Sequence, residues 1–390
     1  RSPSRGLGDV YKRQEEKGSC TAMLMSAPID LFTAMADKRK APPAGDAALV
    51  KRARADEHAL ISHQNRKTHL SSPVISLAGA HGAEVLDVKY APDGHTLAAA
   101  SADKTISVWE AFGENRNIGQ LLGHSSAVTC LAYVPGTEGL LVSGSADGTL
   151  IVWSTVTGEK LRRLRGHRGI VNSVSATRSA SGHIASASDD GRVLIWDVDA
   201  KHPVDSIEFG YPITAIEWSD DATQLFVGGL DNAIHAVDVA TKQRHYSLLG
   251  HTDTVASVAL CRTGTHLVSA GLDDSVRVWD VRPYAPPKRP GERGSPRLFR
   301  TLTGMASGFE HILIKAAWSP DGERVASGGA DRTSNLWDVE QGAMLLKLPG
   351  HAGTCTAVAF HPHEAVLASA STDRTVLPVS YTHLTLPTKA

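Results

Sequence analysis

The chain has 390 residues, of which 42% are hydrophobic, so it is long enough and apolar enough to bury a sizeable core. The 40 Lys and Arg residues nearly balance the 41 Asp and Glu residues, which excludes a global attraction to nucleic acid or to an anionic membrane. Cys20, Cys130, Cys261 and Cys355 form no CxxC pair, and no apolar stretch reaches the roughly 18 residues of a membrane span. We therefore expect a reduced protein with no disulfide framework, no zinc site and no membrane contact.

Residues 1–34 carry no folding pattern, and "RSPSRGLGDVYKRQ" at the start is typical of translated linker sequence. The apolar residues 20–36 resemble a signal peptide, but they contain Asp30, and the basic cluster follows them instead of preceding them. We expect residues 1–34 to be a non-native or untranslated leader, with Met35 as the natural start.

Residues 35–72 form a basic tail, which we expect to be disordered. Two basic clusters, separated by a ten-residue spacer, are typical of a bipartite nuclear-import signal that lies in two acidic grooves of an import receptor. The alternative is an ordinary solvated tail. The spacing favours binding to a nuclear import receptor and a location in the nucleus. The residues concerned are Lys38, Arg39, Lys40, Lys51, Arg52 and Arg54.

The chain then repeats itself, and each repeat has the pattern of several short strands with Pro-Asp-Gly turns. Seven aligned aspartates are separated by steps of 44, 43, 41, 42, 58 and 42 residues, close to a period that indicates a repeat architecture. The aspartates are Asp103, Asp147, Asp190, Asp231, Asp273, Asp331 and Asp373. Gly-His pairs recur ahead of several units, at Gly123-His124, Gly166-His167, Gly250-His251 and Gly350-His351, with Ala80-His81 as a degenerate copy.

In these features the units resemble WD repeats. The resemblance covers residues 73–377 and implies an all-β fold, a seven-bladed WD-repeat β-propeller. The last unit ends after its third strand, whereas "SPVISLAG" before His81 is a strand without a unit. We therefore predict that Val74 to Leu77 completes the seventh blade and closes the ring.

Three units contain a His, a Ser, an Asp and a Trp at corresponding positions, which raises the possibility of a hydrolase triad. An enzyme needs one such site, not several at a fixed period, and the chain has no GxSxG elbow. We interpret each set as a hydrogen-bonded brace, from the indole through the hydroxyl and the imidazole to the carboxylate. The sets are His124, Ser143, Asp147 and Trp153; His167, Ser186, Asp190 and Trp196; and His251, Ser269, Asp273 and Trp279.

Other chemistry-bearing motifs are absent from the sequence: there is no GxxxxGK[ST] loop, no HExxH and no aromatic RNA-binding motif. We expect no enzymatic activity, no cofactor and no metal.

Two units depart from the pattern. The fourth has Val227 and Val237 in place of Ser and Trp and lacks a Gly-His pair. The sixth keeps Ser, Asp and Trp but also lacks the pair, and His311 is a candidate substitute although its spacing is wrong. We predict that packing mainly holds these two blades, and they are either tolerant of change or specialised for a partner.

The 58-residue step arises from residues 280–304, which are rich in Pro, Gly and basic residues, so we expect an exposed loop. The loop either recognises a partner or is a surface insertion that the fold tolerates and that has no function. Residues 378–390 are expected to be a non-native tail. The candidate partner contacts in the loop are Arg282, Tyr284, Lys288, Arg289 and Arg293.

Several stretches together resemble the family of WD-repeat subunits of the spliceosomal U5 small nuclear ribonucleoprotein: "VRVWDVRPYAPPKR", "AAWSPDGERVASGGADR", "KLPGHAGTCTAVAFHP" and the bipartite basic segment. The resemblance implies a non-catalytic scaffold in pre-mRNA splicing. It would dock on the large central U5 scaffold protein (pre-mRNA-processing factor eight) and on other spliceosomal proteins, with only indirect contact to U5 RNA. The loop "PGERGSP" is longer than the family's usual connection.

A second function stays open. Residues 279–282, Trp-Asp-Val-Arg, match the WDxR signature of substrate receptors of cullin-RING ubiquitin ligases. Affinity purification from nuclear extract distinguishes the two functions by the proteins that are recovered.

Overall fold

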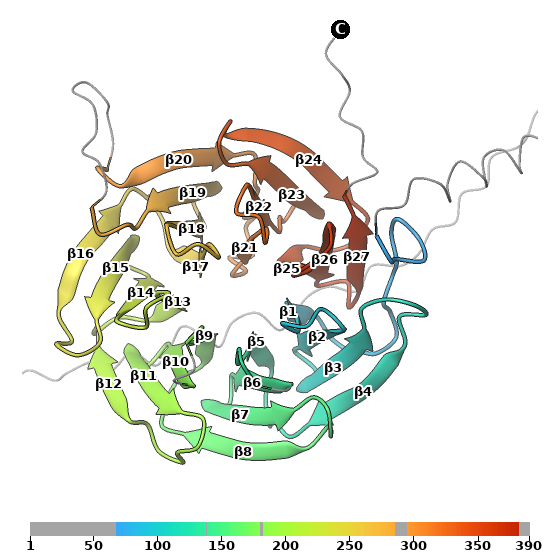
Figure 1. The fold of residues 1–390 in the computed structure, drawn as a ribbon, viewed down its shortest axis with the longest axis horizontal. Helices are drawn as coiled ribbons and strands as arrows, with labels where there is room; N and C mark the ends of the chain where they lie inside the picture. Colours follow the sequence, from blue (N-terminus) through green and yellow to red (C-terminus); the bar gives the residue numbers. More distant parts are fainter. Residues whose placement is uncertain (1–67, 138, 180–181, 285–294, 382–390) are drawn as a thin grey trace, which may run out of the picture. The chain divides into compact units, whose positions relative to one another are not determined.

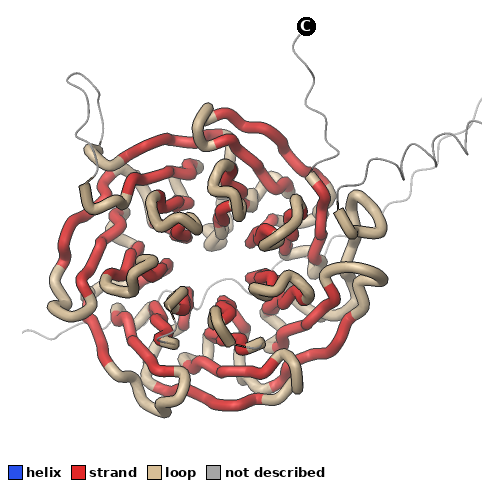
Figure 2. Tube along the Cα trace, in the orientation of Figure 1, coloured by secondary structure: helices blue, strands red, loops and turns tan. Residues whose placement is uncertain are grey.

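The computed structural model describes residues 68–137, 139–179, 182–284 and 295–381. Figure 1 shows their 27 strands as seven antiparallel sheets arranged around a central axis. These residues consist of strands and loops without a helix (Figure 2). The prediction of an all-β, seven-bladed propeller is therefore confirmed.

Six sheets contain four strands and one contains three, and within each blade the strands follow chain order from the centre to the rim (Figure 1). The bounds, blade by blade, are β1 (Val85–Tyr90), β2 (Thr96–Ser101), β3 (Thr105–Glu110) and β4 (Asn117–Leu122); β5 (Val128–Tyr133), β6 (Leu140–Ser145), β7 (Thr149–Ser154) and β8 (Lys160–Arg165); β9 (Val171–Ala176), β10 (His183–Ser188), β11 (Arg192–Asp197) and β12 (Asp205–Glu208); β13 (Ile213–Trp218), β14 (Gln224–Gly229), β15 (Ala233–Asp238) and β16 (Arg244–Leu249); β17 (Val255–Leu260), β18 (His266–Gly271), β19 (Ser275–Asp280) and β20 (Leu298–Thr303); β21 (Ala316–Trp318), β22 (Arg324–Ser327), β23 (Thr333–Asp338) and β24 (Ala343–Pro349); and β25 (Cys355–Phe360), β26 (Val366–Ser371) and β27 (Val376–Ser380).

The turn from β6 to β7 shows how the sequence makes these strands. Asp147 accepts a hydrogen bond from the backbone N–H of Thr149 (2.9 Å), and Gly148 has φ 72°, a conformation that costs glycine little. The β-branched and apolar residues on either side then pair as β6 and β7.

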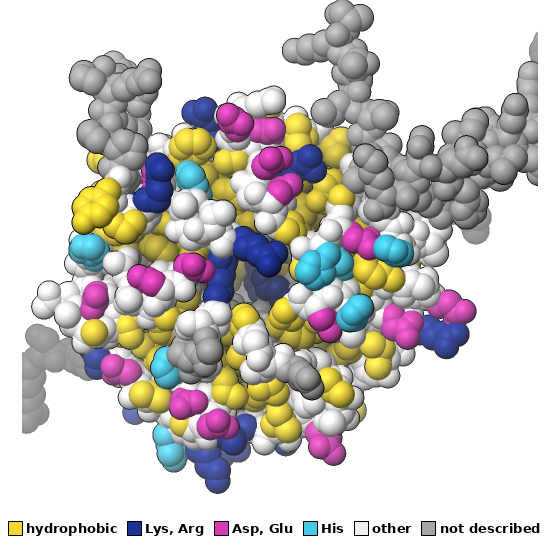
Figure 3. Space-filling model, viewed as in Figure 1, with side chains coloured by type: hydrophobic (Ala, Val, Ile, Leu, Met, Phe, Trp, Pro, Cys, Tyr) yellow, Lys and Arg dark blue, Asp and Glu magenta, His cyan; other side chains and the backbone are white. Residues whose placement is uncertain are grey.

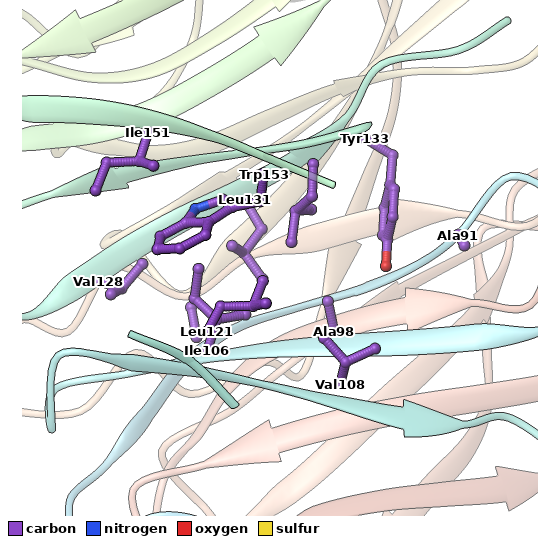
Figure 4. Packing of buried hydrophobic residues seen from close by; sticks show 12 residues of the cluster. Ala91, Ala98, Ile106, Val108, Leu121, Val128, Leu131, Tyr133, Ile151 and Trp153 are labelled. Atoms are coloured by element: carbon purple, nitrogen blue, oxygen red, sulfur yellow. The ribbon is translucent and has the colours of Figure 1, made fainter. Parts of the chain in front are cut away.

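The hydrophobic core is divided among the interfaces between neighbouring blades. Between blades 1 and 2, Leu121 of β4 and Ile106 of β3 lie close to Trp153 of β7, and all three are at most 4% exposed (Figure 4). Comparable clusters fill the other interfaces, including the one between blades 7 and 1. Each fully buried large side chain contributes about 1.5–3 kcal/mol, so every blade is stabilised mainly by its two neighbours.

Hydrogen bonds on or next to the innermost strands join each blade to the next one around the ring. They connect Leu131 N to Asp87 Oδ2 (2.8 Å), Thr129 Oγ1 to Val171 O, Ile216 N to Ser173 Oγ (3.4 Å), Thr214 Oγ1 to Val255 O (2.5 Å), Ala316 N to Ser257 Oγ (3.0 Å), Lys315 N to Thr356 O (2.8 Å) and Thr356 Oγ1 to Val85 O (2.7 Å).

The segment before blade 1 closes the ring, as predicted. Leu77 N donates to Val376 O (2.9 Å), Val376 N donates to Leu77 O (3.1 Å) and Ile75 N donates to Pro378 O (3.0 Å). Leu77 is 5% exposed and packs in the cluster between blades 7 and 1. Residues far apart in the sequence thus share one sheet.

Strand β27 runs beyond the predicted boundary at Leu377 to Ser380, because Val379 pairs with Leu367 of β26 and is buried. The expectation that residues 378–390 are non-native remains a prediction.

The predicted loop 280–304 was too long. Its last residues form β20, in which Leu302 is buried and pairs with Val276 of β19, so the insertion is confined to residues 281–297. The aromatic, β-branched and leucine residues of "LFRTLT", without Pro or Gly, are the signal that assigns this end to the sheet.

The leader, the import signal (Lys38, Arg39, Lys40, Lys51, Arg52 and Arg54) and Lys288, Arg289 and Arg293 lie outside the described residues. Within the described ranges there is no helix long and apolar enough to cross a bilayer.

Replacing Leu77 with proline tests the closure, because proline cannot donate the hydrogen bond to Val376 and removes the buried leucine side chain. We expect Leu77→Pro to lower the free energy of unfolding by about 3 kcal/mol or more in urea denaturation. Ser76→Pro is the control, since Ser76 is exposed between the two donating residues. Equal stability of the two variants would show that the segment does not close the ring.

Candidate functional site

The structure brings each predicted set of four side chains together. In blade 2, Trp153 Nε1 donates to Ser143 Oγ (2.8 Å), His124 Nε2 lies 2.7 Å from the same oxygen, and His124 Nδ1 lies 3.2 Å from Asp147 Oδ2. Blades 3 and 5 repeat this arrangement with the same contact types at 2.7–3.0 Å, through His167, Ser186, Asp190 and Trp196, and through His251, Ser269, Asp273 and Trp279.

The protonation states follow from the surroundings. Burial lowers the pKa of His124, of His167 and of His351, so these imidazoles are neutral near pH 7. Burial alone would raise the pKa of Asp190, but hydrogen bonds from Arg168 N and His167 lower it to about 2. A neutral imidazole that donates through Nδ1 to a carboxylate must accept through Nε2. The serine hydroxyl therefore donates to the histidine and accepts from the tryptophan.

This geometry has the hydrogen-bond order of a catalytic triad but gives the serine no access to a substrate. Ser143, Ser186 and Ser269 are 0% exposed, and an indole N–H engages each hydroxyl oxygen. We interpret the sets as braces that join the turn between the second and third strands to the loop that enters the blade.

Blade 1 contains a complete set that the sequence pattern missed. His81 contacts Asp103 (3.0 Å) and Ser107 (2.7 Å), and Trp109 donates to Ser107 (2.8 Å). Ser107 lies on the third strand, directly opposite Ala99 on the second strand, where the other blades carry their serine. Blade 7 has the same contacts of His351 to Asp373 (3.0 Å) and Ser369 (2.8 Å).

Blade 4 has apolar clusters on both sides, and it also contains a polar network that the sequence pattern did not predict. His235 of β15 lies 2.5 Å from Asp231 and 2.7 Å from Ser247 Oγ. His235 lies on the third strand of the blade, opposite Val227, and reaches the turn from there instead of from the entry loop. The brace is rebuilt with a different histidine.

Blade 6 uses still other partners. Trp337 donates to Thr303 O (3.1 Å), Ser327 to the Met305 sulfur (3.1 Å), and Lys347 binds Asp331 (3.0 Å). His311 is exposed and does not replace the missing histidine.

A cavity of about 630 Å³, which we call the blade 4–5 groove, is lined by Phe226, Tyr246, Arg282, Tyr284 and Arg297 among others. It lies on the propeller face that holds the turns between first and second and between third and fourth strands. The Arg297 guanidinium lies 4.1 Å from the Tyr246 ring centroid, and Tyr284 is 96% exposed. Arg282 and Tyr284, the two predicted contact residues within the described ranges, thus both line this groove.

Hydrogen bonds fix the rim of the groove. Arg297 donates to the carbonyl of Arg282 (2.8 Å), and Arg282 Nε donates to Asp280 (3.0 Å). These bonds hold the two arginines in place beside Tyr284, whose ring is left free for contact. Preorganised aromatic and arginine side chains are the residue types that dominate protein interfaces.

The centre of the ring forms a second polar region. Figure 3 shows Lys and Arg side chains around the central opening. Lys315 Nζ binds Asp87 (2.7 Å) and Thr129 O (2.9 Å), which leaves this pair internally satisfied. Burial raises the pKa of Glu217 there, despite Arg178 and Lys89 nearby.

Among the cysteines in the described ranges, Cys130, Cys261 and Cys355 are buried and unpaired, and no cluster of potential metal ligands occurs there. Cys20 lies outside these ranges.

Moving the blade 1 serine tests the brace. Ser107→Ala leaves the Trp109 indole and His81 Nε2 without a partner, so we expect the free energy of unfolding to fall by about 1–3 kcal/mol. Adding Ala99→Ser to this variant restores the hydroxyl from the opposite strand and should recover most of the loss in urea denaturation. A double variant no more stable than Ser107→Ala would contradict the brace. Ser327→Ala in blade 6, which has no histidine partner, is the low-effect control.

Stability should also depend on pH. Five buried or half-buried histidines have a pKa in the folded protein below the value of about 6.5 that histidine has in an unfolded chain. As the pH falls below 6.5, the unfolded chain therefore binds more protons than the folded protein, and the free energy of unfolding decreases. We expect the urea midpoint to be constant above pH 7.5 and to drop between pH 6.5 and 5, with a shallower drop in His167→Gln. A midpoint that stays constant to pH 5 would show that these histidines remain paired when protonated. The five are His124, His167, His266, His351 and His361.

Comparisons with known proteins agree with this geometry. The family model "WD domain, G-beta repeat" matches residues 71–110, 115–154, 158–197, 242–280, 301–338 and 342–377, which contain the first three strands of blades 1–3, 5 and 6, and those of blade 7 up to Leu377 in β27. The chain is 34% identical over 344 residues to "Pre-mRNA-splicing factor cwf17" of Schizosaccharomyces pombe, covering 87% of this chain and 98% of that protein.

Two further relatives share one name, "U5 small nuclear ribonucleoprotein 40 kDa protein". The one from Dictyostelium discoideum is 35% identical, covering 81% of this chain and 87% of the relative. The one from Homo sapiens is 39% identical, covering 79% of this chain and 84% of the relative. The chain therefore belongs to the WD-repeat family, within the group of the U5 small nuclear ribonucleoprotein 40 kDa proteins.

Proposed function

We propose that this protein is a non-catalytic scaffold subunit of the U5 particle in pre-mRNA splicing. The observation that carries the proposal is the match to nearly the full length of a protein named as a pre-mRNA-splicing factor, at 34% identity. The braces support the absence of catalysis, since their serines are buried in a repeated structural set.

The blade 4–5 groove is the surface that we assign to docking on the large central U5 scaffold protein. It combines a hollow with the exposed Tyr284 ring and with two arginines that are already fixed by hydrogen bonds. A partner that binds there therefore loses little free energy in ordering the two arginine side chains. Contact with U5 RNA is indirect in this proposal, because the sequence has no aromatic RNA-binding motif.

Nuclear location follows from the same proposal. Residues 35–54 contain the two basic clusters that an import receptor would bind, and this segment lies outside the described residues.

The ligase-receptor alternative retains one observation in its favour, the WDxR segment at residues 279–282. There Arg282 is bound by Asp280, so it would approach an adaptor as part of an ion pair.

Affinity purification from nuclear extract tests the proposal. The tagged full chain should recover U5 proteins, and Arg282→Ala with Tyr284→Ala should reduce recovery of the large scaffold protein about tenfold or more, the loss typical of central aromatic and arginine contacts. Recovery of ligase adaptor subunits without U5 proteins would support the alternative.

The matched control is Phe309→Ala with Arg332→Ala. Phe309 is 101% exposed but lies in the loop between β20 and β21, at the opposite end of β20 from the groove. Similar loss in both double variants would exclude the groove as the docking site.

A further inference from the structure

Strand β8 at the rim of blade 2 carries a concentration of positive charge that no function assigned above uses. Its sequence "KLRRLR" contains four cations, and Arg168 follows it. Each of the other fourth strands carries at most one Lys or Arg: β4 reads "NIGQLL", β12 "DSIE", β16 "RHYSLL", β20 "LFRTLT" and β24 "AMLLKLP". Among the strands of the described residues, β8 thus carries the largest number of Lys and Arg side chains, in a chain with a net charge of only −1.

The register shows where these side chains point. Leu164 is buried toward blade 3, whereas Arg163 donates to Gly123 O and Arg165 follows two residues later on the same face. The Lys160 side chain also approaches Gly123, on the same blade 1 side. Lys160, Arg163 and Arg165 therefore form a row along the edge.

Most of this charge has no partner inside the described part of the chain. Arg162 pairs with Asp199 at 3.6 Å, and Arg163 is used by the Gly123 carbonyl. Lys160, Arg165 and Arg168 are exposed, and they form no hydrogen bond or ion pair through their side chains in the described ranges. Adjacent like charges repel each other, so an anionic partner would stabilise this edge.

The backbone of β8 is also open on one side. Its sheet runs β5-β6-β7-β8, so β8 pairs only with β7, and Figure 1 shows it at the outer rim. An edge strand can accept another strand, which supplies main-chain hydrogen bonds and places side chains opposite one another.

We propose that β8 is the docking edge for an extended acidic segment of a partner protein, which adds as an antiparallel strand. Alternate carboxylates on such a segment repeat at the same spacing, about 6.6 Å, as alternate cations on β8. The chain's own segment 35–67 does not fit, because its basic clusters have the same sign as β8.

The observations favour a peptide over single-stranded nucleic acid. The aromatic residues of blade 2, Tyr133 and Trp153, are both buried, so the edge offers no ring on which a base could stack. The free main-chain edge presents both N–H donors and C=O acceptors, and a peptide strand can pair with both kinds of group, whereas phosphates can only accept.

Site-specific photo-crosslinking in the assembled complex tests the proposal, with a matched pair of positions. Leu161 on β8 and Ile118 on β4 are the corresponding bulge residues of neighbouring outer strands and are 53% and 54% exposed. We expect Leu161, and not Ile118, to crosslink to a protein segment rich in Asp and Glu. The proposal would be overturned if Leu161 crosslinked to RNA, crosslinked to a protein segment that is not rich in Asp and Glu, or gave no crosslink. It would also be overturned if both positions gave the same product.

A charge variant and a peptide probe separate strand pairing from plain attraction. Lys160→Gln, Arg165→Gln and Arg168→Gln together should lower both the Leu161 crosslink yield and the affinity for an alternating Glu-Thr peptide about tenfold. The control removes equal charge from exposed turn residues, Lys104→Asn, Arg332→Asn and Arg374→Asn, and should change neither.

The same peptide with alternate amides N-methylated cannot form the main-chain bonds and should bind about tenfold more weakly. If the methylated and unmethylated peptides bound with equal affinity, strand addition would be excluded. It would also be excluded if an oligouridine bound more tightly than the peptide and the charge variant abolished that binding.

Discussion

The closure of the ring is the constraint on which the rest of the structure depends. The backbone bonds between Leu77 and Val376 join the segment before blade 1 to the last sheet, and the hydrogen bonds on the inner strands then run unbroken around the centre. Since each core cluster lies between two blades, no blade has a complete core of its own. If one interface opened, the buried apolar side chains of both blades would be exposed to water. The stability of each blade therefore depends on the closed ring.

Within that ring, the polar braces show what could be predicted from sequence and what could not. The repeat period and the recurring His, Ser, Asp and Trp identified seven units and three braces. The networks of blades 1 and 4 were missed because a brace requires a hydroxyl or imidazole at a point in space, not at a position in the repeat. Ser107 reaches that point from the strand opposite Ala99, and His235 from the strand opposite Val227. Cross-strand register, which pairs such positions, is invisible in a one-dimensional alignment.

Element boundaries were less predictable for a related reason. Residues 298–303 follow a long Pro-rich and Gly-rich stretch and read as part of it, yet burial of Leu302 against blade 6 selects the strand. Likewise, the groove could not be located from sequence, because it joins Phe226 and Tyr246 of blade 4 to Arg297 of blade 5. The sequence indicated Arg282 and Tyr284 only as members of an insertion.

The distribution of charge links the fold to a scaffold role. A propeller provides faces built from turns and a rim built from edge strands, and mutations in either need not disturb the interfaces between blades. In this chain the aromatic and arginine contacts gather in a hollow on one face, whereas free cations gather on the rim strand β8. The first suits a partner held by packing, and the second suits one attracted by charge and held by its backbone. Because the two surfaces belong to different blades, both can be occupied at once, which is the physical requirement for a subunit that joins other chains without chemistry of its own.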